Sequence, residues 1–220
     1  MTDFDTARAT MVDCQIRPAD VTAHDVLNAF ESVPREAFVS PSQRPLAYID
    51  EDILVQQGDA ARYMMEPRSF ARLVQLAEVS RDCIVLDVGC ATGYSTAILS
   101  LLSNSVVAVE SDETLASQAS ANLAELSHDN AVVVHSALED GYAAEGPYDV
   151  IFIGGAVDFV PDDLKSQLKD EGRMVVVEGT GNAGRAMVYV REGDVVSGRA
   201  IFNCAVKPLP GFEKAAEFAF

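Results

Sequence analysis

The stretch VLDVGCATGYSTAIL, residues Val85–Leu99, contains the pattern that decides the fold. Its first residues are aliphatic and indicate a buried strand, and the residues from Tyr94 onward indicate a helix. Gly89 and Gly93 lie between them and allow a tight turn from strand to helix. A helix that begins directly after a strand presents free backbone N–H groups, which bind carboxylates and phosphates. The stretch therefore predicts a site for a nucleotide-like ligand.

The spacing of these glycines argues against a dinucleotide. The fingerprint G-x-G-x-x-G places a central glycine against the pyrophosphate. Ala91 stands at that position here, and Cys90 and Thr92 add bulk beside it. We therefore expect a ligand without a pyrophosphate, which disfavours a nicotinamide oxidoreductase.

Glu110 ends the next aliphatic run, SVVAVE, at residues 105–110. An acidic residue at the end of the second strand commonly accepts hydrogen bonds from both hydroxyls of a ribose. Adenosine without a pyrophosphate but with a carboxylate-bearing tail describes S-adenosylmethionine. The glycine turn and Glu110 together predict a site for this cofactor.

From Cys83 onward, short aliphatic runs alternate with helical patterns, which indicates an α/β fold with a mostly parallel sheet covered on both faces. The expected strands are Ile84–Val88, Ser105–Glu110, Ala131–Val134, Asp149–Ile153 and Met174–Glu178. The expected helices are Tyr94–Leu102, Glu113–Leu126 and Pro161–Leu168. After Glu178 the helices stop, and antiparallel strands around the turn REGD are expected at Ala186–Val190 and Arg199–Ala205.

The part before Cys83 is expected to be helical with loops. Thr22 and Asp25 have the spacing of a capping box, which predicts a helix over Thr22–Glu31. Pro34 and Pro67 each fit a first helical position.

The long stretch 40–66 between these prolines is expected to be irregular, and so long a connection is usually functional or disordered. We therefore predict an N-terminal helical extension with a substrate-side loop over residues 1–80. A Rossmann-like cofactor-binding domain with a C-terminal hairpin is predicted over 81–220. The tail carries Phe212, Phe218 and Phe220, which are expected to dock on another surface.

Composition limits the partners and the compartment. The formal net charge of -18 argues against non-specific nucleic-acid binding and against docking on an anionic membrane. The 4 cysteines and 3 histidines have no metal-ligand spacing, so no metal site is expected and the thiols are expected to be reduced. With no leader-like N-terminus and no long apolar run, the sequence predicts a cytoplasmic protein.

Four segments resemble the successive motifs of the Rossmann-like class I methyltransferase fold: VLDVGCATGYSTAIL, VVAVES, PYDVIFIGGA and LKDEGRMVVVEG. More narrowly, SVPREAFV, LAYIDEDILV, QLKDEGRMV and GYSTA resemble the protein-L-isoaspartate O-methyltransferase family. The resemblance extends from about Met11 to Val177. It implies methyl transfer from S-adenosylmethionine to the carboxylate of isoaspartyl residues in damaged proteins or peptides, a protein-repair reaction.

The resemblance also implies a set of cofactor-binding residues. The methionine and ribose end would be lined by Asp87, Gly89, Cys90, Ala91 and Gly93. Glu110, followed by Ser111, would accept the ribose hydroxyls. The turn Ser136, Ala137, Leu138 and Glu139 would border the adenine, with either Ser136 or Glu139 supplying a polar contact.

The substrate loop departs from the family pattern. Family members have a loop similar to Gly-Gln-Thr-Ile-Ser-x-Pro, whereas this chain has Ala61-Arg-Tyr-Met-Met-Glu-Pro67. Met65 thus stands where a substrate-facing serine is expected. Arg62 and Tyr63 are the candidates for contacting an acceptor carboxylate, and packing is the alternative role for this segment.

The chemistry of a carboxylate acceptor fits the residues present. A carboxylate is already anionic, so its methylation needs orientation and exclusion of water rather than a general base. A phenol or amine acceptor would need a base, and His24, His128 and His135 have no supporting neighbours in the sequence. A different acceptor, such as a small molecule, and a non-catalytic cofactor-binding module remain the alternatives. The oligomeric state is not predicted.

Overall fold

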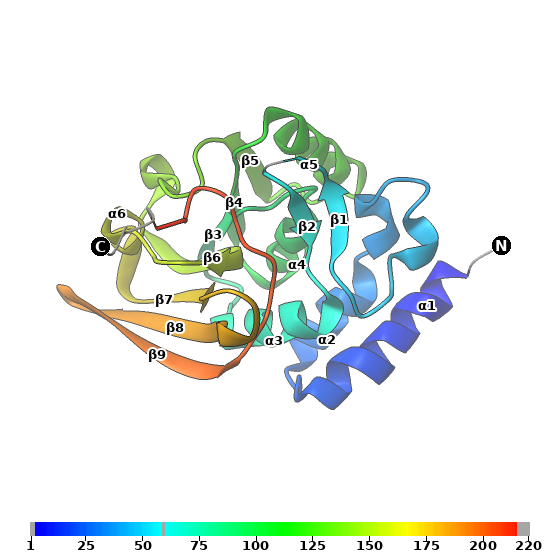
Figure 1. Ribbon diagram of the computed structural model, residues 1–220, viewed down its shortest axis with the longest axis horizontal. Coiled ribbons are helices and arrows are strands. Elements are labelled where there is room, and N and C mark those ends of the chain that lie inside the picture. Colours follow the sequence, from blue (N-terminus) through cyan, green and yellow to red (C-terminus); the bar gives the residue numbers. More distant parts are fainter. Residues whose placement is uncertain (1–2, 59, 215–220) are drawn as a thin grey trace, which may run out of the picture.

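The computed structural model describes residues 3–58 and 60–214, and within these ranges a seven-stranded sheet forms the centre of the molecule (Figure 1). The strand order is β5-β4-β3-β6-β7-β8-β9. Their bounds are β3 (Ile84–Val88), β4 (Ser105–Glu110), β5 (Ala131–His135), β6 (Tyr148–Val157), β7 (Leu168–Glu178), β8 (Arg185–Glu192) and β9 (Val195–Asn203). Strands β3 to β7 pair in parallel, whereas β8 and β9 pair antiparallel. The predicted α/β fold with antiparallel C-terminal strands is confirmed.

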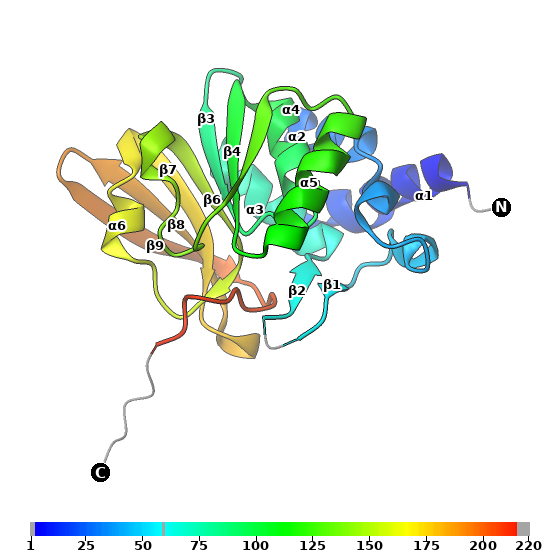
Figure 2. The ribbon, with the colours of Figure 1, turned by 90° about the horizontal axis from the view of Figure 1, so that it is seen from above.

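Helices cover one face of this sheet more fully than the other. In Figure 2 the helices α2 (His24–Ser32), α3 (Pro67–Ala77), α4 (Tyr94–Leu102) and α5 (Glu113–Glu125) lie on one side, and α6 (Asp162–Lys165) lies on the other. Successive side chains of β3 point to opposite faces of the sheet. Val85 packs in the first hydrophobic core, on the face covered by α2 to α5, and Leu86 packs in the second core, on the face that carries α6. The second core is completed by Leu138, Leu164 and Phe212.

The N-terminal part joins the first core directly. Helix α1 (Phe4–Met11) leads through a π-helical turn, Val12–Ile16, toward α2. Phe30 of α2 and Phe70 of α3 lie 5.2 Å apart between ring centroids, and both contact Tyr94 of α4. One hydrophobic core therefore runs from α1 to β6, and the division of the chain at residue 80 stays a prediction.

The predicted helix start at Thr22 is wrong. Helix α2 begins at His24 after the N-cap Ala23, and no side chain caps it. Instead, Gln75 Oε1 of α3 accepts hydrogen bonds from the N–H groups of Thr22 and Ala23, at 2.7 and 3.0 Å. A partner more than fifty residues away thus replaces the local capping box.

The two prolines behave differently. Pro67 is the first residue of α3, as predicted. Pro34 instead precedes the short 3-10 helix Arg35–Phe38 as its N-cap, so its predicted position is wrong by one residue.

The stretch 40–66 is not wholly irregular, because it contains an antiparallel hairpin of β1 (Ile53–Gln56) and β2 (Arg62–Met64). The hairpin lies outside the main sheet, near the carboxyl end of β4 and the start of α5 (Figure 2). Its strands are short, and their pairing shifts between Leu54 and Gln56.

Several predicted elements have different lengths. The helix predicted over Pro161–Leu168 is limited to α6, because wholly buried Leu168 already pairs with Tyr148 as part of β7. Strands β6 and β7 are accordingly longer than predicted, and so is β8. Strand β9 begins earlier than predicted and ends at Asn203, two residues before the predicted end.

The chain after β9 returns to the sheet. Phe212 is 1% exposed and accepts a backbone hydrogen bond from Asp158, which confirms that this part of the tail docks. Phe218 and Phe220 lie outside the described residues. Over the described part of the chain, no helix has the length and apolarity needed to cross a bilayer.

Candidate functional site

The candidate site lies where the direction of strand addition reverses. The chain passes from β3 outward to β4 and β5 and then returns to β6 on the other side of β3. Ligands of open α/β sheets bind in the crevice at such a switch point, beyond the carboxyl ends of the strands. Gly89 follows β3 and Gly154 lies in β6, and a Cβ atom on Gly154 would be only 3.1 Å from the Gly89 carbonyl oxygen. The glycines therefore border a narrow crevice.

The turn after β3 is built from left-handed residues. Gly89 has φ +86° and Gly93 has φ +96°, and a Cβ atom on Gly93 would be 3.3 Å from the backbone of Ala119 in α5. Ala91 adopts φ +49° although it carries a side chain, a conformation that costs about 1 kcal/mol or more. This conformation accompanies a hydrogen bond of 2.8 Å from the Ala91 N–H to Glu110 Oε2.

Glu110 at the end of β4 is 0% exposed and is surrounded by donors. Its Oε1 accepts hydrogen bonds from the N–H groups of Ser111 and Asp112, at 2.8 and 3.2 Å. Nη1 of Arg62 in β2 donates to the same oxygen at 2.5 Å, and Arg62 is itself 3% exposed. Glu110 therefore belongs to a buried ion pair with the hairpin that the sequence did not predict.

Asp87 on β3 is the second buried carboxylate at this turn. Its Oδ2 accepts hydrogen bonds from the hydroxyls of Ser95 and Thr96 in α4, each at 2.7 Å. Its Oδ1 is buried without a hydrogen-bond partner in residues 3–58 and 60–214. Burial raises the pKa of the Asp87 carboxyl to about 6. A buried acceptor atom without a donor is costly, so Asp87 Oδ1 fits a ligand that brings a donor.

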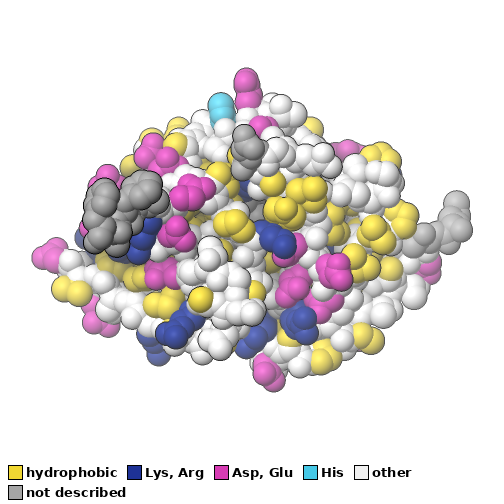
Figure 3. Space-filling view, in the orientation of Figure 1, with side chains coloured by type: hydrophobic (Ala, Val, Ile, Leu, Met, Phe, Trp, Pro, Cys, Tyr) yellow, Lys and Arg dark blue, Asp and Glu magenta, His cyan; other side chains and the backbone are white. Residues whose placement is uncertain are grey.

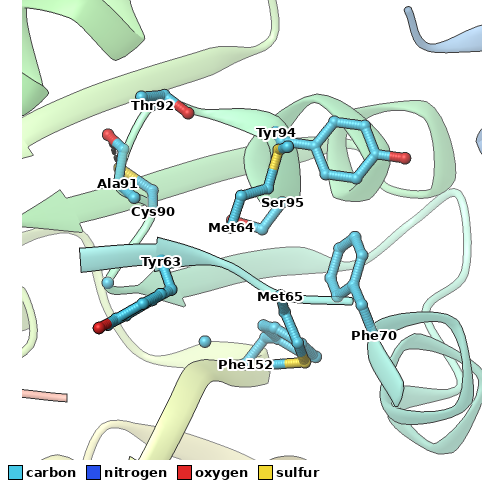
Figure 4. Close-up of a pocket in the computed structure, with 12 residues that line it drawn as sticks. Tyr63, Met64, Met65, Phe70, Cys90, Ala91, Thr92, Tyr94, Ser95 and Phe152 are labelled. Atoms are coloured by element: carbon cyan, nitrogen blue, oxygen red, sulfur yellow. Dashed lines mark hydrogen bonds between the residues drawn. The ribbon is translucent and has the colours of Figure 1, made fainter. Parts of the chain in front are cut away.

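A cavity separates the glycine turn from the hairpin (Figure 4). Met64 of β2 points toward Tyr94 and Ser95 at the start of α4, and Met65 points toward Phe152 of β6 (Figure 4). The cavity is lined by Tyr63, Met64, Met65, Phe70, Gly89, Cys90, Ala91, Thr92, Tyr94, Ser95, Phe152 and Gly154. Five residues of the predicted site, Tyr63, Met65, Gly89, Cys90 and Ala91, are thus brought together at one cavity.

A second cavity lies beside the first and shares Tyr63, Met65 and Gly154 with it. It is also lined by Arg62, Asp52, Val206, Lys207, Pro208 and Leu209. The Lys207 ammonium lies 5.5 Å from the centroid of the Tyr63 ring. Burial raises the pKa of the Asp52 carboxyl. This cavity therefore combines two cationic side chains with an aromatic ring and one carboxyl.

The remaining predicted residues lie around these cavities without lining them. The Ser136 N–H donates to the Glu110 carbonyl at 3.1 Å, so the turn after β5 begins beside Glu110. Leu138 is 1% exposed and packs in the second core, and the Glu139 carboxylate lies against Gly211. Ala137 is half-buried between them. The choice between Ser136 and Glu139 as an adenine contact stays open.

The lining residues that the sequence did not single out come from several segments. Ser95 and Tyr94 begin α4 within the glycine motif itself. Phe152 and Gly154 lie in the run PYDVIFIGGA, whose paired glycines within a strand were a usable indication of close backbone approach. Lys207 follows β9, and no local pattern marked it.

Groups for other chemistries are located elsewhere. His128 Nδ1 and Ser100 Oγ are 2.8 Å apart, and His135 Nε2 lies 3.0 Å from the Ser111 carbonyl. Neither histidine lines either cavity. In the described residues, no group of three or more His, Cys, Asp or Glu side chains could hold a metal ion. The four cysteines are free thiols.

On the face seen in Figure 3, acidic and basic side chains are interspersed over the described residues.

Comparisons with known proteins identify the relatives of this chain. A family model described as protein-L-isoaspartate(D-aspartate) O-methyltransferase matches residues 7–213. A protein-L-isoaspartate O-methyltransferase from Koribacter versatilis is 32% identical over 211 residues, which cover 96% of this chain and 94% of the relative. Another, from Rhodopseudomonas palustris, is 35% identical over 178 residues, which cover 81% of this chain and 80% of the relative.

Solved structures agree in fold. A protein-L-isoaspartate O-methyltransferase structure matches with a TM-score of 0.81 at 24% identity, covering 93% of this chain and 66% of that chain. A putative one from Plasmodium falciparum, in complex with S-adenosyl-L-homocysteine, matches with a TM-score of 0.76 at 17% identity and covers 95% of this chain and 99% of that chain. Together with the family match over nearly the whole length, these findings show that the chain belongs to the protein-L-isoaspartate(D-aspartate) O-methyltransferase family.

Proposed function

We propose that this chain is an S-adenosylmethionine-dependent O-methyltransferase that methylates the carboxylate of isoaspartyl residues in damaged proteins or peptides. Its role is protein repair, and its place is the cytoplasm. Family membership supports the reaction class, and the geometry of two buried carboxylates supports the cofactor.

The observation that carries the proposal is the placement of two buried carboxylates, Asp87 and Glu110, at the glycine turn. S-adenosylmethionine supplies a methyl group on a sulfonium sulfur and carries an ammonium at one end and a ribose next to the sulfur. The unpaired Oδ1 of Asp87 fits the ammonium, because it is a buried acceptor without a donor. Glu110 fits the ribose hydroxyls, because its carboxylate stands at the end of the second parallel strand.

The backbone between these carboxylates completes the fit. Gly89, Cys90 and Ala91 line the cavity, and Gly89 has no side chain to fill it. We assign the methionine and ribose end to this segment with Gly93, and the adenine edge to the turn that holds Ser136 and Glu139. Ser111 holds the Glu110 carboxylate through its N–H group.

The acceptor end is assigned to the hairpin. Tyr63 and Met65 line both cavities and so stand between the first cavity, assigned to the cofactor, and the second cavity, assigned to the acceptor. Tyr63 offers a hydroxyl donor, and Arg62 and Lys207 offer cations, all of which suit a carboxylate. Met65 is 8% exposed and supplies an apolar wall that excludes water from the reacting atoms.

A second candidate function keeps the cofactor and changes the acceptor. Met65 in place of a serine makes the wall more apolar than the family loop would, and an apolar small molecule would suit such a wall.

The test measures methyl transfer from labelled S-adenosylmethionine to an isoaspartyl peptide and to the matching aspartyl peptide. Selective transfer to the isoaspartyl peptide is expected. In the same sample, binding of S-adenosylhomocysteine is measured by calorimetry. Binding without transfer to either peptide would leave the cofactor assignment standing and reject the isoaspartyl acceptor.

A further inference from the structure

The carboxylate assigned to the ribose is already saturated by the protein. A carboxylate has about four acceptor positions. Oε1 of Glu110 receives the Ser111 and Asp112 N–H groups and the Arg62 guanidinium, and Oε2 receives the Ala91 N–H. No more than one position on Oε2 is left, whereas a ribose presents two hydroxyls. Arg62 is the only one of these donors that is a side chain on a separate hairpin, so it is the donor that can leave.

The space over the glycine turn is filled as well. A Cβ atom on Gly89 would be 3.1 Å from Nη2 of Arg62 and 2.9 Å from Cδ2 of Leu209. The first cavity holds about 30 Å³ of space for water, and a single water needs about 10–15 Å³ on this measure. A nucleoside therefore enters only if Arg62 and its hairpin move.

We propose that Arg62 exchanges between two positions and so makes acceptor binding depend on cofactor binding. In the cofactor-free protein Arg62 pairs with Glu110 and closes the ribose site. When the ribose hydroxyls donate hydrogen bonds to the Glu110 carboxylate, they displace the Arg62 guanidinium. The guanidinium then moves to the second cavity and binds the acceptor carboxylate there. The proposal rests on the proposed function, since it uses the same cofactor and acceptor.

The second cavity provides the other position. Arg62 already lines it together with Lys207, so its displaced guanidinium would lie beside a second cation. Two cations at one cavity are unfavourable for each other and favour an incoming carboxylate. In the paired position Arg62 offers the acceptor no free charge, because it is 3% exposed and bound to Glu110. The exchange therefore predicts that the cofactor binds first.

A short hairpin carries Arg62, and a hydrogen bond from Gln56 Nε2 to Asp112 Oδ2, at 2.7 Å, ties this part of the hairpin to the turn after β4. β1 and β2 form a two-stranded sheet of their own. Arg62 pairs with Gln56 at the point where the register shifts, so the β2 end that carries the guanidinium is the irregular end. Met64, at the other end, is anchored next to Met65, whose carbonyl accepts a hydrogen bond from Arg35 at 2.7 Å. Movement of Arg62 thus leaves the anchored end in place.

The first experiment compares S-adenosylhomocysteine affinity in wild-type protein, Arg62→Gln and the control Arg68→Gln. Arg68 carries the same charge close by, but it is 53% exposed and pairs with Asp50. If the form with the Arg62–Glu110 pair outnumbers the open form by about ten to one, removing the Arg62 guanidinium lowers the dissociation constant for S-adenosylhomocysteine about ten-fold. Arg68→Gln is expected to leave it unchanged. Equal dissociation constants in wild type and Arg62→Gln, or binding in neither, would overturn the proposal.

A second experiment uses unmodified protein, so it does not depend on the variant folding. Phenylglyoxal labels exposed guanidinium groups, and the labelled peptides are measured by mass spectrometry. Arg62 is expected to be protected without ligand and labelled faster with S-adenosylhomocysteine, while Arg68 serves as the internal reference. Unchanged or stronger protection of Arg62 on ligand binding would contradict the exchange.

The acceptor-binding step of the proposed exchange is tested separately, by peptide binding. Binding of the isoaspartyl peptide to wild-type protein is expected only when S-adenosylhomocysteine is present, and Arg62→Gln is expected to lose most of that binding. Peptide binding that is equal with and without cofactor would overturn the ordered exchange. Tighter cofactor binding by Arg62→Gln together with no transfer to any isoaspartyl peptide would uphold the closing role of Arg62 and reject the acceptor named under the proposed function.

Discussion

Nη1 of Arg62 lies 2.5 Å from Oε1 of Glu110, and 3% and 0% of the two side chains are exposed. The pair joins the hairpin to the end of β4, at the point where a ribose is expected to bind. A buried ion pair contributes little net stability against an apolar alternative, but removing one partner leaves an uncompensated buried charge. The pair is therefore expected to control ligand binding more than stability, as long as both partners are present.

Glu110→Gln separates these two effects. The variant leaves Arg62 buried without a counter-charge, so its free energy of unfolding is expected to fall by about 3 kcal/mol in urea titrations. Affinity for S-adenosylhomocysteine is expected to fall by about ten-fold or more, because hydrogen bonds to a charged acceptor are the stronger ones. The double variant Arg62→Gln/Glu110→Gln is expected to regain most of the stability and not the affinity. Wild-type affinity in Glu110→Gln would reject the ribose assignment.

This pair also shows what the sequence could and could not predict. Glu110 was located at the strand end because the aliphatic run before it is continuous and ends in a charge. Arg62 is separated from it by 48 residues and lies in a stretch that was predicted to be irregular. No periodicity connects the two residues, since the hairpin that brings them together has strands of only 4 and 3 residues.

The bounds of helices and strands were likewise predicted correctly where local patterns set them, and wrongly where tertiary contacts do. Helix Tyr94–Leu102 and strand Ile84–Val88 were predicted at their observed bounds, because buried aliphatic runs and a glycine turn delimit them locally. Strand β7 begins well before its predicted start because Leu168 and Arg173 pair with Tyr148 and Val150 of β6, on either side of a polar segment where the register shifts. The hydrogen bonds from the N–H groups of Thr22 and Ala23 to Gln75, just before α2, are likewise a tertiary contact that replaces a local one.

Asp87 predicts a pH dependence of cofactor binding. Its pKa is raised to about 6 from 3.8 by burial, so in the ligand-free protein the carboxyl becomes protonated as the pH falls through about 6. A ligand ammonium pairs only with the charged form, so the dissociation constant for S-adenosylhomocysteine is expected to rise about ten-fold per pH unit below that pKa. Calorimetry between about pH 5 and about pH 8 measures this dependence.

The matched variant is Asp87→Asn, which keeps the hydrogen bonds from Ser95 and Thr96 possible and removes the titration. It is expected to bind more weakly at neutral pH and to show no change in affinity near pH 6. For stability the sign is opposite. Because the raised pKa keeps a proton on the native state, the wild-type free energy of unfolding falls as the pH rises from 3.8 to about 6. A wild-type affinity that is flat through pH 6 would refute the pairing of Asp87 with the ammonium.

Arg35 predicts a stability effect at the anchored end of the hairpin. The side chain is wholly buried and donates hydrogen bonds to the carbonyls of Ala47 and Met65, both at 2.7 Å. Its guanidinium lies 4.8 Å from the centroid of the Tyr94 ring. Arg35→Met leaves two carbonyls without donors, so the free energy of unfolding is expected to fall by about 3 kcal/mol.

The control for this prediction is Arg17→Met, since Arg17 is 46% exposed and its partner Asp13 is 68% exposed. A change within about 0.5 kcal/mol is expected there. Both variants are compared by urea unfolding. A similar, small loss in the two proteins would show that Arg35 does not hold the segment that carries Met65.

Tyr63 gives the most direct test of the acceptor end. It lines both cavities, the Lys207 ammonium lies 5.5 Å from its ring centroid, and its hydroxyl is the neutral donor that the proposed function assigns to the acceptor carboxylate. Tyr63→Phe removes the hydroxyl and keeps the ring. A hydrogen bond to a charged acceptor contributes about 1.5 kcal/mol, so kcat/KM for the isoaspartyl peptide is expected to fall about ten-fold. Affinity for S-adenosylhomocysteine is expected to stay as in wild type, because the hydroxyl is not assigned to the cofactor.

Tyr142→Phe is the matched control, because Tyr142 packs against the second core and lines neither cavity. Its kcat/KM is expected to equal that of wild type. If Tyr63→Phe also has wild-type kcat/KM, then Tyr63 only packs, and the cations Arg62 and Lys207 alone must hold the acceptor carboxylate. If the variant instead loses S-adenosylhomocysteine affinity in parallel with kcat/KM, the hydroxyl belongs to the cofactor side and the division of roles between the two cavities is wrong.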